Sequence, residues 1–400
     1  MTWLFWICLG IVVYAYLGYP LVLLVVSVFK KRRPLRAPFR GSFSFVLCVH
    51  NEEANLRRRV DELRAMVERS GLDGEIILVS DGSTDATVPL AHDLEAQGLL
   101  RFLERPGKAG KAAALSAGAA LAKGDILVFC DARQRWDDAA LPRLLENFAD
   151  PHVGAVSGDL VLETASGVLA GVALYWRMEK WLRKRESAVY SQVGATGAVS
   201  ACRRELFRPI PAGTLCDDVY WPLCVAMQGY RVVHEENARA YDRLPDKPRD
   251  EFRRKVRTLA GCYQIAGLLP ASLLPWRNPV WFAWVSHKLL RLLVPWALIA
   301  LFAVNLALVL LDPPAWARGE TAAEFWRDAF FPVFLAVQGL GYLLGSIGLE
   351  PRLGRRAPLA GVAASFLVLN AAAFLAFWVW ATGRTGRAWS KIAYEPADGP

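Results

Sequence analysis

Residues 3–29, WLFWICLGIVVYAYLGYPLVLLVVSVF, contain no charged side chain. A helix of this length is long enough to cross the roughly 30 Å hydrocarbon core of a bilayer. The alternative is a signal peptide, but the run lacks a basic start, is too long and has no convincing small-residue cleavage site. We therefore predict an N-terminal transmembrane helix within residues 1–29.

Three further apolar runs lie at about 289–311, 330–349 and 358–382, and 54% of all residues are hydrophobic. They predict three more transmembrane helices within 289–382. The preceding segment, 266–288, mixes Pro, Trp, Arg and Lys and is expected to lie along the membrane surface as an interfacial helical segment. Residues 383–400 form a polar tail.

The basic linker at 30–42 begins KKRRPLR and contains no acidic residue. The positive-inside bias places it in the cytoplasm, which puts the N-terminus outside and makes the chain a multi-pass protein of the cell membrane with a cytosolic catalytic domain. The linker would also bind anionic membrane lipids, and nucleic acid is disfavoured as a partner because this basic run adjoins a span. Four spans leave the C-terminus outside, whereas Arg384, Arg387 and Lys391 favour the inside, and the sequence leaves both open.

Residues 43–265 alternate between strand and helix patterns. Apolar strands are expected at 43–49, 75–80 and 125–130, and helical periodicity follows each of the first two. This pattern is typical of an α/β domain with a mostly parallel, Rossmann-like sheet, which binds ligands at the carboxyl ends of its strands. Seven cysteines without a C-x-x-C pair indicate reduced thiols facing a cytosol.

Polar clusters follow all three strands: His50-Asn51-Glu52-Glu53, Ser80-Asp81-Gly82-Ser83 and Asp131-Ala132-Arg133. One such cluster alone is usually a helix cap or a turn. Their recurrence at consecutive strand ends predicts a binding site instead. Gly-Lys pairs at 107–108 and 110–111 add cations suited to a phosphate group, although a solvated helix start would also explain them.

These motifs together resemble a known family. In order, VHNEE, VSDGSTDAT, GKAAALSAG and CDARQRW are similar to the nucleotide-sugar half of membrane-bound family 2 glycosyltransferases, which have the GT-A fold. GATGAVSACRRELF, CDDVYWPLCVAMQGYRVV and FRRKVRTLAGCYQ resemble the acceptor and gating half. The resemblance covers most of 43–265, and the flanking spans fit synthases of the poly-N-acetylglucosamine, hyaluronan and cellulose type.

The resemblance implies a role for each matching residue of the donor site. Asp81 would contact the nucleotide, His50 and Glu52 would lie near its base, and Lys111 would approach the donor diphosphate. Asp131 aligns with the first Asp of the Asp-x-Asp motif and would bind a divalent cation, Mg²⁺ or Mn²⁺. Arg133 replaces the second Asp.

The resemblance also implies which residues belong to the acceptor side. Asp218 aligns with the catalytic base at the end of the Thr-Glu-Asp motif, directly after Asp217. Gly197 lies in the acceptor half. Arg257 matches the Arg of the Gln-x-x-Arg-Trp gating motif, whose Gln and Trp are replaced by Arg254 and Thr258.

Sugar transfer needs a stabilised leaving diphosphate and a carboxylate that deprotonates the acceptor hydroxyl. Mg²⁺ binds to one or two carboxylates plus phosphate oxygens, so Asp131 alone suffices. Arg133 cannot bind a cation, but it can bind a phosphate directly or pair with a nearby carboxylate. Capping of the following helix is the other interpretation of Asp217, and two adjacent carboxylates also raise the pKa of one of them.

The leading hypothesis is therefore an inverting transferase that moves a sugar from a nucleotide-diphosphate sugar to a growing glycan or a lipid-linked acceptor, for cell-surface or exopolysaccharide synthesis. Polymer export and transfer of a single sugar both stay open. The alternative is a non-catalytic membrane transport or structural protein with a degenerate sugar-binding domain, for which Arg133 is the main support.

Overall fold

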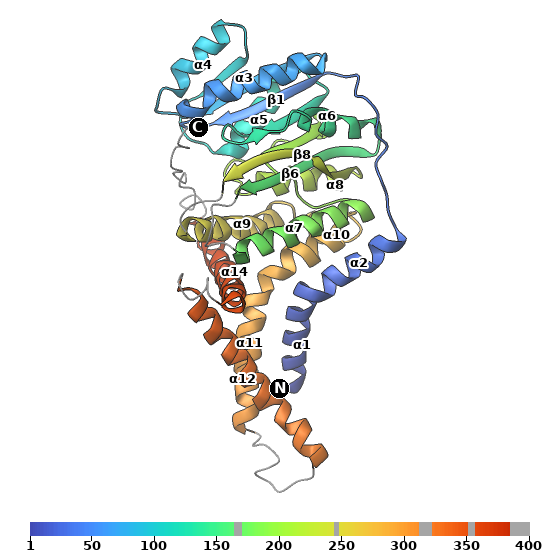
Figure 1. Ribbon diagram of the computed structural model, residues 1–400, viewed down its shortest axis with the longest axis vertical. Helices are drawn as coiled ribbons and strands as arrows, with labels where there is room; N and C mark the ends of the chain where they lie inside the picture. The colour runs from blue at the N-terminus through green and yellow to red at the C-terminus, as the bar shows by residue number, and fades with distance from the viewer. Residues whose placement is uncertain (164–169, 244–247, 312–321, 351–356, 385–400) are drawn as a thin grey trace.

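The computed structural model describes residues 1–163, 170–243, 248–311, 322–350 and 357–384. A mixed β-sheet with its covering helices forms one end of the molecule, and long apolar helices form the other end (Figure 1). The polar tail expected at 383–400 lies outside the described residues from 385 onward, as do the linkers 312–321 and 351–356.

The part of the chain that the structure describes forms an eight-stranded sheet in the order β3-β2-β1-β4-β7-β6-β8-β5. The strands are β1 Phe43–Val49, β2 Gly74–Asp81, β3 Arg101–Arg105, β4 Ile126–Cys130, β5 Arg135–Trp136, β6 Val153–Glu163, β7 Val199–Arg203 and β8 Arg231–Arg243. The first four in the order pair in parallel, β7 is antiparallel to both β4 and β6, and β8 is parallel to β6 and antiparallel to β5. The mostly parallel half predicted from the sequence is confirmed, and an antiparallel insertion extends it.

Strand β1 shows why this half reads as continuous apolar sequence. Phe43, Phe45 and Leu47 point into the core on one face, and Val46 points into the core on the other. Alternate side chains of a strand lie on opposite faces, so a strand that is covered on both sides is apolar at most positions.

Helices cover both faces of the sheet. They are α3 Glu53–Ser70, α4 Thr87–Ala96, α5 Lys111–Leu121, α6 Ala140–Leu145 and α8 Asp217–Met227. Leu56, Val60 and Leu63 of α3 pack on the β1 face that carries Phe45. Helix α3 ends at Gly71 with φ +62°, a left-handed conformation that glycine adopts without a Cβ clash.

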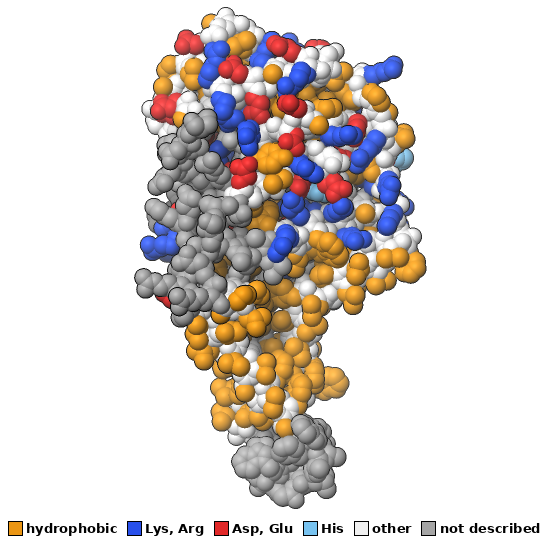
Figure 2. Space-filling model, in the orientation of Figure 1, with side chains coloured by type: hydrophobic (Ala, Val, Ile, Leu, Met, Phe, Trp, Pro, Cys, Tyr) orange, Lys and Arg blue, Asp and Glu red, His pale blue; other side chains and the backbone are white. Residues whose placement is uncertain are grey.

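Within the described residues, four helical segments are long and apolar enough to cross a membrane: Thr2–Phe29, Trp281–Leu311, Ala329–Gly348 and Pro358–Ala381. Figure 2 shows hydrophobic side chains over this end of the molecule and charged ones over the sheet end. The first segment comprises α1 Thr2–Val13, a π-helical turn η1 Tyr14–Gly18 and α2 Tyr19–Phe29. The others comprise α10 Trp281–Ala283, the π-helical turn η5 Trp284–Leu289 and α11 Leu290–Leu311, then α12 Ala322–Gly348 and α14 Pro358–Ala381.

The second of these helices begins at Trp281, inside the segment that we expected to lie along the membrane surface. Short turns at 270–273 and the helices α7 Ala170–Val189 and α9 Pro248–Leu268 lie between the sheet and the apolar end (Figure 1). Helix α7 contacts α2, and α9 contacts α14. Helices α7 and α9 therefore connect the sheet with the long apolar helices.

Candidate active site

The three predicted polar clusters meet at one pocket. It opens at the carboxyl ends of β1, β2 and β4, the edge at which ligands bind in such sheets. Its lining comprises Cys48, Val49, His50, Glu52, Asp81, Lys108, Lys111, Ala114, Asp131, Ala132, Arg133 and Gln134. All six residues predicted for the donor site are in this list.

Asp81 at the end of β2 is 4% exposed and fixes the loop before α5. Its carboxylate accepts hydrogen bonds from the backbone N–H of Ala109 at 3.0 Å and of Gly110 at 2.7 Å. Gly82 makes this packing possible, because a Cβ there would lie 2.6 Å from the carbonyl carbon of Gly107. Asp81 therefore shapes the pocket wall as well as lining it.

His50 joins β1 to the same loop. Its Nδ1 lies 2.9 Å from the Asp81 carbonyl oxygen, and its Nε2 lies 3.3 Å from Lys108 Nζ. A carbonyl only accepts and an ammonium only donates, so Nδ1 donates and Nε2 accepts. Lys108, from the first Gly-Lys pair, therefore lies in the pocket as that pair suggested.

Glu52 lies at the start of α3, where the chain turns out of β1. Asn51 has φ +55°, a left-handed conformation that asparagine tolerates, and its side-chain oxygen accepts a hydrogen bond from Thr84 N at 2.7 Å. Glu52 N donates to Thr87 Oγ1 at 2.8 Å, and the Glu52 carboxylate accepts from Asn55 Nδ2 at 2.9 Å. The turn that carries Glu52 is thus tied to the segment after β2.

Lys111 and Asp131 form an ion pair in the pocket, with Nζ 2.6 Å from Oδ1. Burial alone would lower the pKa of Lys111, but the carboxylates of Asp131 and Asp217 outweigh it and raise that pKa. Lys111 is therefore a fixed positive charge beside the proposed metal ligand.

Arg133 pairs with a carboxylate, one of the two roles that the sequence left open. Its Nε and Nη2 donate to Asp242 Oδ1 and Oδ2 at 3.0 and 2.8 Å, a bidentate arrangement, and Gln134 Nε2 donates to Asp242 Oδ2 at 2.9 Å. Asp242 is on β8, more than a hundred residues away in the chain, and no sequence pattern points to it. Arg133 also lines the pocket, so its predicted contact with the donor stays a prediction.

Asp217 and Asp218 are the first two residues of helix α8 and lie close to the Lys111–Asp131 ion pair. Cys216 occupies the N-cap position and no side chain caps the helix, so capping does not explain Asp217. Burial, opposed by Lys111 and reinforced by Asp218 and Asp131, raises the pKa of Asp217 to about 6. The rise in pKa that we expected for one of two adjacent carboxylates therefore occurs at Asp217.

Gly197 lies close to both Asp218 and Lys111. A Cβ on Gly197 would lie 3.3 Å from Lys111 Nζ and 3.8 Å from Asp218 Cβ. Ala195 N donates to the Asp218 carbonyl at 2.8 Å, which fixes this loop to the start of α8. Gly197 and Asp218 thus lie next to the donor pocket.

The predicted gating residues are on α9, outside the pocket lining. Arg254 pairs with Glu251 at 2.7 Å and lies 5.5 Å from the centre of the Trp176 ring. Arg257 is one turn further along the helix. Gly261 brings α9 against the residue before Asp217, because its Cβ would lie 2.4 Å from Cys216 Sγ.

The described residues contain no group of three or more His, Cys, Asp or Glu able to hold a metal ion. Asp131, with its pocket-facing partner Lys111, fits the weaker requirement of one carboxylate beside an incoming diphosphate. All seven cysteines lie in the described part of the chain and are free thiols.

Comparison with known proteins identifies the domain. Residues 44–210 match the model of glycosyl transferase family 2. The poly-β-1,6-N-acetyl-D-glucosamine synthase of Staphylococcus aureus is 24% identical over an alignment 236 residues long, which covers 56% of this chain and 55% of that protein. The Staphylococcus epidermidis enzyme of the same name is 22% identical over 228 residues, with the same coverage. The chain therefore spans about half the length of these relatives.

A solved structure shares the fold over almost the whole chain. The mannosyltransferase of Pyrobaculum calidifontis, in complex with GDP-mannose and Mn²⁺, has a TM-score of 0.66 and 21% identity, covering 95% of this chain and 99% of its own. Residues 44–210 are thus a family 2 glycosyltransferase domain with the GT-A fold, as the resemblance implied. These matches favour the enzyme over the non-catalytic alternative. The family match ends before Asp217 and does not test the predicted base.

Proposed function

We propose that this chain is a membrane-bound inverting glycosyltransferase that moves a sugar from a nucleotide-diphosphate sugar to a glycan or lipid-linked acceptor. The observation that carries the proposal is the Lys111–Asp131 ion pair, 2.6 Å long, in a pocket at the edge where β1, β2 and β4 end and beside Asp217 and Asp218. It brings together a cation for the leaving phosphate and a carboxylate for a metal.

In the donor site, Asp81, His50 and Glu52 would surround the nucleotide end, and Lys111 would bind the diphosphate. Asp131 would hold Mg²⁺ or Mn²⁺, which supplies charge stabilisation to the leaving diphosphate. The mannosyltransferase that shares this fold was solved with Mn²⁺ and GDP-mannose, which supports a cation at this position. Arg133 would add a second positive charge while it stays paired with Asp242.

The acceptor would approach from the side of Gly197, Asp217 and α9. Asp218 would accept the hydroxyl proton as the acceptor oxygen attacks the anomeric carbon. Gly197 leaves room at this point because it has no side chain between Lys111 and Asp218. Arg254 and Arg257 on α9 would border the acceptor path, since α9 packs against Cys216 next to these carboxylates.

Four apolar helices support a multi-pass protein of the cell membrane, and the basic linker at 30–42 supports a cytosolic active site with the N-terminus outside. In this arrangement 43–265 is the transferase domain. The linker would contact anionic headgroups at the cytosolic surface.

A screen of nucleotide sugars tests the proposal. The purified full chain in lipid nanodiscs is incubated with Mg²⁺ or Mn²⁺ and single donors, beginning with UDP-N-acetylglucosamine and GDP-mannose, and release of nucleoside diphosphate is measured. We expect release with one donor and not with the others. Absence of release and of binding across all donors would contradict the proposal.

A further inference from the structure

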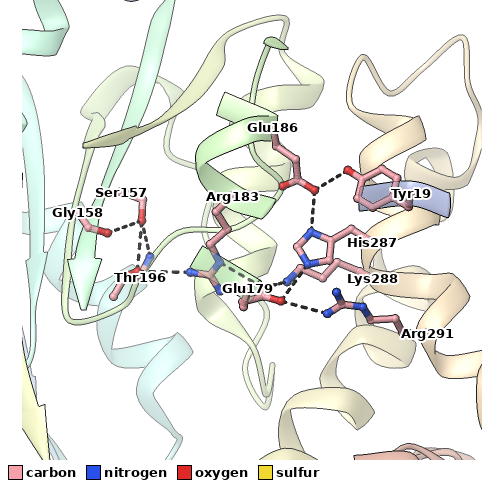
Figure 3. A network of polar contacts seen from close by, with 10 residues as sticks. All are labelled: Tyr19, Ser157, Gly158, Glu179, Arg183, Glu186, Thr196, His287, Lys288 and Arg291. Atoms are coloured by element: carbon pink, nitrogen blue, oxygen red, sulfur yellow. Dashed lines mark hydrogen bonds and ion pairs between the residues drawn. The ribbon is translucent and has the colours of Figure 1, made fainter. Parts of the chain in front are cut away.

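Two buried carboxylates of α7 lie between the sheet and the apolar helices. Glu179 is 3% exposed and Glu186 is 2% exposed, and both face His287, which is fully buried (Figure 3). A buried carboxylate without a partner is strongly destabilising, so the partners of these two groups have to stay in place.

His287 bridges the two carboxylates. Its Nδ1 lies 2.7 Å from Glu186 Oε1, and its Nε2 lies 2.9 Å from Glu179 Oε2. Burial would raise the pKa of Glu179, but His287 and Lys288 outweigh it and hold that pKa well below its usual range. An ionised carboxylate only accepts hydrogen bonds, so the ring Nε2–H donates to Glu179.

Two candidate spans converge on this bridge. Tyr19 of the first span donates its hydroxyl to Glu186 Oε1 at 2.6 Å, and Arg291 of the second donates to Glu179 Oε2 at 3.2 Å. Tyr14 Oη of the first span also lies 3.0 Å from Ser286 Oγ of the second.

Both spans change helix type at this level. The π-helical turn 14–18 precedes Tyr19, and the π-helical turn 284–289 contains His287. A π-turn inserts one residue and rotates the side chains beyond it, and such turns occur frequently at functional sites.

The network continues from Glu179 toward the active site. Arg183 Nε donates to Glu179 Oε1 at 3.2 Å, and Arg183 Nη1 donates to Thr196 Oγ1 at 3.4 Å. Thr196 N donates to Ser157 Oγ at 2.9 Å. Figure 3 shows these residues in one chain of contacts from Tyr19 to Ser157.

Thr196 lies in the loop that borders the reaction site. The residue before it, Ala195, holds the Asp218 carbonyl, and the residue after it, Gly197, faces Lys111 and Asp218. A displacement of Thr196 would therefore move the main chain that carries Asp218.

We propose that Glu186, His287, Glu179, Arg183 and Thr196 form a relay of polar contacts that fixes the loop at 194–197 to the first two candidate spans, with Arg183 and Thr196 as positioning residues for Asp218. The assignment of Asp218 rests on the proposed function, whereas the mechanical link between α7 and the loop does not. An acceptor or lipid that shifts the π-helical turn at His287 changes the position of Asp218 through this relay.

The test uses isosteric variants of the full chain in lipid nanodiscs. Thr196→Val removes the hydroxyl at the loop end, Glu186→Gln removes the charge at the membrane end, and the double variant combines them. Thr196→Ser restores the hydroxyl. Lys184→Met is the matched control, because Lys184 is the neighbour of Arg183 on α7 but is exposed and pairs with Glu236 at the surface.

Two readouts separate this relay from the proposed function. The first is amide hydrogen exchange of 194–198, which needs no activity. We expect faster exchange there in Glu186→Gln and Thr196→Val and no change in Lys184→Met and Thr196→Ser. Unchanged exchange of this loop in Glu186→Gln would overturn the relay even in an active enzyme. If the wild type transfers no sugar, the proposed function fails and the exchange experiment still decides the relay.

The second readout is transfer kinetics. Thr196→Val and Glu186→Gln are each expected to lower kcat about tenfold at unchanged donor KM, since small misplacements of a reacting group are costly. Lys184→Met and Thr196→Ser are expected to keep the wild-type kcat. The double variant is expected to lose about the same factor as one single variant, because both interrupt one chain of contacts. Multiplication of the two losses, to about a hundredfold, would overturn the relay. If Glu186→Gln does not yield folded protein, Tyr19→Phe, which removes one hydroxyl, takes its place with the same expected outcomes.

Discussion

Lys111 Nζ lies 2.6 Å from Asp131 Oδ1, at the edge of the sheet where the ends of β1, β2 and β4 meet. In the proposed reaction each member of this pair exchanges its partner, since Lys111 turns to a phosphate and Asp131 to a divalent cation.

Comparison of the loss of sugar transfer in Asp131→Ala with that in Arg133→Ala tests whether the reaction uses a metal ion. Asp131→Ala should lower transfer by about a thousandfold, because the cation loses its protein ligand. Arg133→Ala should mainly raise the donor KM, by roughly tenfold, through loss of one phosphate contact. Steady-state kinetics with and without a chelator measures both. Full activity in excess chelator together with a crippling effect of Arg133→Ala would make Arg133 a substitute for the metal.

Asp81→Ala should weaken nucleotide binding. The carboxylate holds the amides of Ala109 and Gly110, so its loss releases the loop that carries Lys108 and Lys111. We expect the Kd for the nucleotide to rise by about tenfold or more, equivalent to about 1.4 kcal/mol or more. Calorimetry measures it, with Asp93→Ala on the exposed side of α4 as a control. An unchanged Kd would remove Asp81 from the donor site.

Cysteine labelling tests the orientation of the chain. In a background without the seven native thiols, Leu35→Cys in the exposed linker should be shielded from impermeant reagents in intact cells. Thr2→Cys at the other end of the first span should react. Reaction at position 35 and protection at position 2 would reverse the topology.

His234 on β8 makes stability depend on pH. Burial, with help from the nearby charge of Arg183, lowers the pKa of His234 to about 3. The unfolded chain binds a proton near pH 6.5 and the folded chain does not, so stability falls as the pH drops below 6.5. The loss at pH 4 is at most about 3 kcal/mol, which follows from the two pKa values.

Thermal unfolding of nanodisc-embedded protein between pH 4 and 8 measures this effect. The melting temperature of His234→Gln should depend less on pH than that of the wild type, and the exposed His92→Gln should behave like the wild type. Parallel pH curves for wild type and His234→Gln would show that His234 is not held neutral.

Local features of the sequence predicted the parallel half of the sheet well. The run at 43–49 coincides with β1, because the burial of both sheet faces requires a continuous apolar run. The pocket followed from strand ends that meet at one edge. The same reasoning placed the start of the second span near 289, whereas the helix begins at Trp281. Polar residues such as His287 interrupt the apolar run, and His287 contacts Glu179 and Glu186 of α7.

The sequence did not predict contacts between residues that are far apart in the chain. Asp242 meets Arg133 only because β8 joins the far part of the sheet, and Glu179 meets His287 only because α7 packs on the spans. A lone His or Glu in these segments carries no signal for such a contact. The raised pKa of Asp217 likewise arises from burial and from the nearby Asp218 and Asp131, which together outweigh the opposing charge of Lys111.

The most direct measurement of the central claim is sugar transfer by Asp218→Asn beside donor binding by the same variant. A base acts on the acceptor and not on the donor, so we expect transfer to fall by about a hundredfold to ten-thousandfold while the Kd for the donor stays within a few-fold of the wild type. Product formation is followed by mass spectrometry and donor binding by calorimetry on one preparation. Ordinary turnover in Asp218→Asn would contradict the assignment of this carboxylate as the base.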